Sequence, residues 1–142
     1  MTDTDKLFCV LLVEDDPADA HLTRVAFNEA RVLLNLRHVE DGQAAMDDLL
    51  AGKEDRPDLI LLDLNMPRMD GRAFLKAIKS HDSLRRIPIV VLTTSDAESD
   101  IIASYDLGAA GFIVKPIEID HFIHQVQQLE GYWISLVQLP RH

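Results

Sequence analysis

The chain has 142 residues, which suits one domain, because folded domains cluster near ~100–150 residues. Hydrophobic residues make up 47% and charged residues 27% of the chain, a balance typical of globular proteins and not of disordered ones. The formal net charge of -10 disfavours direct binding to DNA, because the phosphates would be repelled over most of the surface.

The N-terminal segment MTDTDKLF carries acidic residues where a secretory signal would need positive charge. No apolar run approaches the ~18 residues of a membrane span, so we expect a cytoplasmic protein without a membrane segment. The single cysteine, Cys9, falls inside an apolar run. We expect it to be a small buried hydrophobe and not a redox thiol.

The first half of the chain alternates apolar runs with segments of helical spacing. The run at 7–13 is too short for most helices and predicts a buried strand. Asp16 then suits a helix N-cap, with Pro17 at the first helical position. The run at 33–39 alternates more between apolar and polar residues and predicts an edge strand, and a helix is predicted at about 43–52.

The second half continues the alternation. Short apolar runs bounded by Asp, Pro or Gly predict strands, and the segments between them have helical spacing. In chain order, we predict a strand at 58–63, a helix at 71–80, a strand at 87–93, a helix at 96–108, a strand at 110–114 and a helix at 118–136.

The order of these elements predicts the fold class. Strands that are apolar on both faces and alternate with helices imply a parallel sheet covered by helices on both sides. We therefore expect an α/β fold with a doubly wound, five-stranded parallel sheet and five helices. Nothing in the sequence divides the chain, so residues 1–142 are expected to form one domain.

Polar residues follow the predicted strands at the edge where open α/β sheets bind ligands. Glu14 and Asp15 follow the first strand, and Asp63 ends the third. Thr93 ends the fourth strand, and Lys115 follows the fifth. Carboxylates a few ångströms apart repel by about 4 kcal/mol per pair at an effective dielectric of roughly 20, so the cluster should either take up a proton or bind a cation. Oxygen ligands without a nearby His or Cys favour Mg²⁺.

This cluster suggests a chemical role for Asp63. A carboxylate beside Mg²⁺ can attack a phosphoryl group and form an aspartyl phosphate, while Lys115 and Thr93 contact the transferred oxygens. The alternative is a purely structural network of acids and a lysine. That network would require the polar ends of four strands to be a coincidence.

Four blocks of the sequence resemble the receiver domains of two-component response regulators, and the resemblance spans residues 7 to about 128. The blocks are LLVEDDP, LLDLNMPRMDG, VVLTTS and GFIVKP. The resemblance implies a flavodoxin-like sheet with strand order 2-1-3-4-5. It also implies a signalling protein, not an enzyme, that accepts phosphate from a histidine kinase and then switches its protein-interaction face.

The resemblance implies a role for each acidic residue of the cluster. Glu14 and Asp15 resemble the metal-binding acidic pair, and Asp63 resembles the phosphorylated aspartate. Asn65 matches the position whose backbone carbonyl completes the metal shell. Mg²⁺ is the cation that these positions are expected to bind.

Three further residues match switching positions of the family. Thr93 resembles the switch hydroxyl, and Lys115 resembles the phosphate-sensing lysine. Phe112 occupies the aromatic switch position, three residues before the lysine, where many members have Tyr. A rotating Phe112 and a static core aromatic are both left open, because Phe lacks the hydroxyl that a buried Tyr would bond.

The resemblance implies that the receiver core, about 7–129, leaves no room for an output domain. Residues 130–142 then read EGYWISLVQLPRH, and so apolar an extension would be costly in water. It either folds back on its own domain or forms an interface with a second copy or a partner. We favour the interface, because Trp and Tyr are common binding anchors, and we expect a homodimer. The ending YWISLVQLP also resembles the tails of stand-alone receivers that pair with bacterial phytochrome-type sensor kinases.

An Mg²⁺-dependent phosphohydrolase with an aspartate nucleophile is the main alternative function. Such enzymes also place a nucleophilic Asp at a strand end, but they typically carry a second Asp two residues later, and here that position is Asn65. A third possibility is a receiver-like domain that is never phosphorylated. The intact set of acids, Thr93 and Lys115 argues against it.

Overall fold

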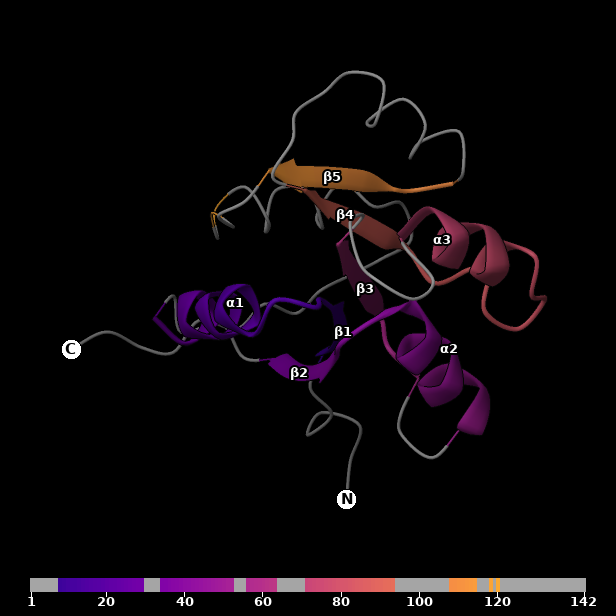
Figure 1. Ribbon diagram of the computed structural model, residues 1–142, viewed down its shortest axis with the longest axis horizontal. Helices are drawn as coiled ribbons and strands as arrows, with labels where there is room; N and C mark the ends of the chain where they lie inside the picture. The colour runs from indigo at the N-terminus through magenta and orange to yellow at the C-terminus, as the bar shows by residue number, and fades with distance from the viewer. Residues whose placement is uncertain are drawn as a thin grey trace.

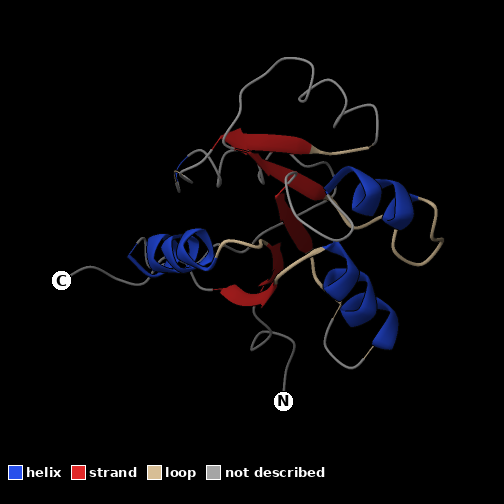
Figure 2. Cartoon of the chain, viewed as in Figure 1, coloured by secondary structure: helices blue, strands red, loops and turns tan. Residues whose placement is uncertain are grey.

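The computed structural model describes residues 8–29, 34–52, 56–63, 71–93 and 108–114, together with residues 118 and 120. Strands and helices alternate through most of this part of the chain, as Figure 2 shows. The elements are β1 (Phe8–Val13), α1 (Pro17–Glu29), β2 (Leu34–Val39), α2 (Gly42–Ala51), β3 (Leu59–Asp63), α3 (Gly71–Lys79), β4 (Ile89–Thr93) and β5 (Gly111–Val114).

All five predicted strands and the first three predicted helices are confirmed, with ends shifted by one or two residues. The helices predicted at 96–108 and 118–136 lie outside the described residues, apart from residues 108, 118 and 120. The extension at 130–142 also lies outside them.

The five strands form one parallel sheet in the order β2-β1-β3-β4-β5. This is the flavodoxin-like order, and β2 lies at an edge, as its alternating sequence predicted. Because all strands run the same way, their carboxyl ends lie together along one edge of the sheet, called the carboxyl edge, which is distinct from the outer strands β2 and β5 (Figure 1). The functional residues must therefore be sought at that edge.

Helices cover both faces of the sheet. Figure 1 shows α1 on one side and α2 with α3 on the other. Leu11 and Val13 of β1 belong to the core cluster that includes Phe74 of α3. Since side chains alternate along a strand, Val10 and Leu12 point to the face of α1, and both are fully buried. Burial on both faces explains why the strand sequences are continuously apolar.

Two acidic caps fix the connections that follow β1 and β2. The Ala18 N–H donates to Asp16 Oδ1 over 2.8 Å, which confirms Asp16 as the N-cap of α1. The Ala44 N–H donates to Asp41 Oδ1 over 2.8 Å, so buried Asp41 caps α2. This second cap was not predicted from the sequence.

Cys9 is 2% exposed in β1, which confirms the expectation of a buried small residue. Among the described residues, no helix combines the length and the apolarity that a membrane crossing requires.

Candidate metal and phosphoacceptor site

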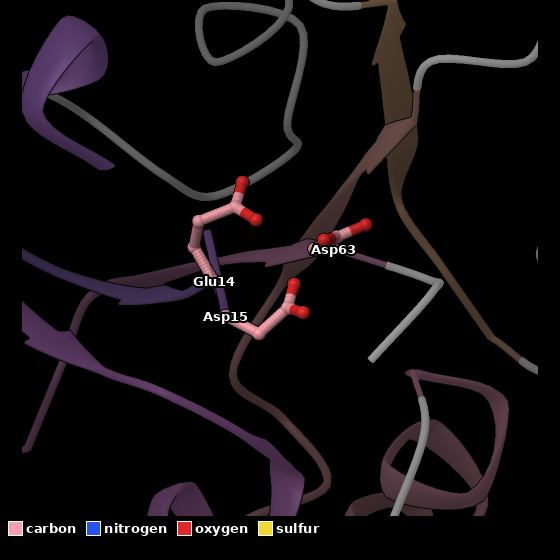
Figure 3. A group of neighbouring side chains, drawn as sticks. All are labelled: Glu14, Asp15 and Asp63. Atoms are coloured by element: carbon pink, nitrogen blue, oxygen red, sulfur yellow. The ribbon is translucent and has the colours of Figure 1, made fainter. Parts of the chain in front are cut away.

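Three carboxylates converge at the carboxyl edge of the sheet. Glu14 and Asp15 directly follow β1, and Asp63 is the last residue of β3. One carboxylate oxygen from each residue lies within 4.8 Å of the other two. Figure 3 shows these side chains as neighbours, with the Asp15 carboxylate directed towards Asp63. The predicted convergence is confirmed for these three acids.

The strand register brings these acids together. Val13 of β1 pairs with Leu62 of the neighbouring parallel strand β3. The next residues in the strand direction are therefore Glu14 and Asp63, respectively, and the two lie side by side. Both are buried, with 0% and 6% of their surfaces exposed. Two carboxylates held so close out of water repel each other, and a cation between them would offset this repulsion.

The main chain at Glu14 is held by the edge strand β2. The Glu14 N–H donates to the Val39 carbonyl over 3.0 Å. The Nε2 atom of His38 lies 2.8 Å from the Glu14 carbonyl oxygen. The Asp16 N–H donates to Glu14 Oε2 over 3.3 Å. No role for His38 was predicted from the sequence, because its contact depends on the register of β2 against β1.

The main chain of Thr93 ends β4 at the same edge. Leu92 pairs with Asp63, and Thr93 pairs with Val114, so the backbone of Thr93 lies one position beyond Asp63. The Thr93 side chain, Asn65 and Lys115 lie outside the described residues. Their predicted roles stay predictions.

Phe112 lies in β5 with its ring partly buried. It pairs with Val91 of β4 and packs against the core cluster on the face covered by α2 and α3. This placement suits a core aromatic. A role for Phe112 as the aromatic switch residue stays a prediction.

The donor set of the cluster fits a hard divalent cation. Glu14, Asp15 and Asp63 offer carboxylate oxygens only, the ligand type that Mg²⁺ and Mn²⁺ prefer. A cation held by these three residues would offset the repulsion between their charges and would attract the oxygens of a phosphoryl group.

Comparisons with known proteins identify the family of the chain. Residues 10–127 match the family model for the response regulator receiver domain. Response regulator Rcp1 of a Synechocystis species is 42% identical over 135 residues, which cover 92% of each chain. A crystal structure of the Mn²⁺-bound form of Rcp1 matches with a TM-score of 0.69 at 40% identity and covers 94% of this chain and 99% of that one.

Two further solved structures are similar. The bacteriophytochrome response regulator AtBRR has a TM-score of 0.82 and 37% identity, over 92% of this chain and 98% of that chain. The phosphorylated cyanobacterial phytochrome response regulator RcpA has a TM-score of 0.74 and 41% identity, over 95% of this chain and 99% of that chain. These matches give no support to the phosphohydrolase alternative. The chain therefore belongs to the response regulator receiver domain family and serves in two-component phosphorelay signalling.

Proposed function

We propose that this receiver accepts a phosphoryl group on Asp63 from a sensor histidine kinase, with Mg²⁺ held by Glu14, Asp15 and Asp63. The observation that carries the proposal is the approach of three carboxylate oxygens to within 4.8 Å at the carboxyl edge of the sheet. Because Glu14 and Asp63 are buried, water screens the repulsion between their carboxylates only weakly. A divalent cation is the natural counter-charge for such a group.

The transfer makes one bond and breaks one. A carboxylate oxygen of Asp63 attacks phosphorus, the bond from phosphorus to the histidine nitrogen of the kinase breaks, and an aspartyl phosphate forms. The leaving imidazole keeps the electron pair of the broken bond. The sheet fixes the nucleophile for this step, because Asp63 is still part of β3 and pairs with Leu92.

Residues on the neighbouring strand ends complete the proposed site. The Asn65 backbone carbonyl would join the metal shell, and Lys115 would pair with the transferred phosphoryl oxygens. The Thr93 hydroxyl would donate to them and so report phosphorylation to the protein-interaction face. Phe112 would follow that change only if its ring leaves the packing that it makes with the core cluster.

The relatives suggest the class of partner. AtBRR is named as a bacteriophytochrome response regulator, and RcpA as a cyanobacterial phytochrome response regulator. We therefore propose a phytochrome-type sensor kinase as the phosphoryl donor. We also propose a non-enzymatic, cytoplasmic single-domain regulator that forms a homodimer through its C-terminal face and residues 130–142. The net charge of -10 argues against direct DNA binding.

The proposal is tested with acetyl phosphate and Mg²⁺, followed by intact-protein mass spectrometry. The parent should gain one phosphoryl group, and Asp63→Asn should gain none. Asp58→Asn is the matched control. Asp58 directly precedes the first residue of β3, at the end of the strand away from Asp63. It accepts a hydrogen bond from the Cys9 N–H over 2.8 Å, which Asn can also accept. An equal adduct on Asp63→Asn, or no adduct on the parent, would refute the assignment.

A further inference from the structure

His38 contacts the acidic cluster through the backbone. Its Nε2 atom lies 2.8 Å from the carbonyl oxygen of Glu14. A carbonyl oxygen can only accept a hydrogen bond, so Nε2 must carry the proton and donate it. The bond therefore acts on the peptide group that joins Glu14 to Asp15.

That peptide group lies at the point where the chain leaves the sheet. In the ladder of β1 and β2, Leu12 pairs with His38 and Val13 pairs with Val39. One position further on, the Glu14 N–H still donates to the Val39 carbonyl over 3.0 Å. The His38 ring adds a second bond on the carbonyl side of Glu14. Strand β2 thus holds this residue at both its N–H and its C=O.

The consequence for the cluster is geometric. The orientation of the Glu14–Asp15 peptide decides where the Cα atom of Asp15 lies, and therefore where its carboxylate can reach. Rotation of this peptide would carry Asp15 away from Asp63, although both strands stayed in place. Since His38 lies in a strand that pairs with β1 along six residues, its donor restricts that rotation.

We propose that His38 is a positioning residue for the divalent-cation site. It holds the Glu14–Asp15 peptide so that the Asp15 carboxylate faces Asp63, and it acts on the cation site only through this backbone contact. The proposal rests on the proposed function, because it assumes that Glu14, Asp15 and Asp63 bind the cation. Partners that orient metal ligands commonly change metal affinity by roughly 10–100-fold, and the remaining bond to Val39 places the expectation at about tenfold.

A comparison of donor and non-donor side chains tests this role. His38→Gln can place an amide N–H near the position of Nε2, whereas His38→Met has a similar length and no donor. His38→Val is a second non-donor variant that suits an edge strand. Mn²⁺ is titrated into each protein, and the free ion is followed by electron paramagnetic resonance. The variants without a donor should bind Mn²⁺ about tenfold more weakly than the parent, and His38→Gln should stay close to the parent.

The matched control is His81→Met. His81 lies after α3, where its Nδ1 atom is 3.0 Å from Ser83 Oγ, and its replacement should leave Mn²⁺ affinity unchanged. Thermal unfolding without metal is measured in parallel, because a merely structural histidine would alter stability and leave the Mn²⁺ affinity of the folded protein unchanged.

Two results would overturn the role of His38 and leave the proposed function intact. One is equal Mn²⁺ affinity in the parent, His38→Met and His38→Val. The other is an equal loss of affinity in His38→Gln and His38→Met. A parent that binds no Mn²⁺ would instead overturn the cation site and, with it, both proposals.

Discussion

The guanidinium of Arg37 in β2 and the carboxylate of Asp48 in α2 form an ion pair of 2.8 Å, with side chains only 14% and 19% exposed. The pair ties the edge strand to the helix that packs over the sheet. It therefore secures the strand whose other residues, His38 and Val39, hold Glu14.

Loss of one partner should destabilise the protein, because the attraction between Arg37 and Asp48 would be lost in a largely buried place. We expect Asp48→Ala to lower the free energy of unfolding by about 2 kcal/mol, below the cost for a fully buried pair. Asp47→Ala is the control on the same helix, since Asp47 is exposed and accepts a surface bond from Gln43 over 3.1 Å. Urea denaturation of both variants is the measurement, and equal costs would contradict the argument.

Gly108 should tolerate no side chain without strain. Its φ is +102°, and an added Cβ would come within 3.0 Å of Lys79 Cε. Gly52 also has positive φ, at +63°, but an added Cβ there meets nothing within 4 Å. We expect Gly108→Ala to cost more than Gly52→Ala, whose penalty should be about 1 kcal/mol.

Thermal and urea denaturation of the two alanine variants compare these costs directly. If Gly52→Ala were the more destabilising, neither the φ of Gly108 nor the approach of an added Cβ to Lys79 would limit this position.

Lys79 should make the free energy of unfolding rise with pH in the alkaline range. Burial lowers the pKa of Lys79 below its ordinary value of 10.5, while its ammonium donates to the Arg85 carbonyl over 3.0 Å. Between the folded-state pKa and 10.5, the unfolded state binds more protons at this site, so its contribution to the free energy of unfolding rises with pH. Lys79→Met should flatten that rise. Identical pH profiles for the variant and the parent in urea denaturation would refute this prediction.

The C-terminal extension should support self-association. Residues 131–142 carry Tyr132 and Trp133 among several aliphatic side chains, a composition that suits an interface core. Removing them should therefore shift the mass measured by light scattering towards the monomer. A truncated chain with the mass of the parent would contradict the proposed dimer interface.

Much of the fold and of the acidic cluster could be predicted from the sequence. The apolar runs fix which segments are buried strands, and the carboxylates at 14, 15 and 63 stand where those runs end. The cap at Asp41 was missed, because the helix was expected to begin only at about 43 and the turn before it carries no apolar pattern. The His38 contact was missed because it depends on the register of β2 against β1, which spacing along one strand does not determine.

The position of the phosphoryl group within the chain shows whether Asp63 is the phosphoacceptor. The protein is phosphorylated by a phytochrome-type kinase or by acetyl phosphate with Mg²⁺, digested rapidly, and analysed by tandem mass spectrometry. We expect one modified residue, Asp63 at the end of β3, and no modification when Mg²⁺ is removed by a chelator. A phosphoryl group on Asp15 or on a histidine, or an Asp63 that is modified equally without Mg²⁺, would contradict this expectation.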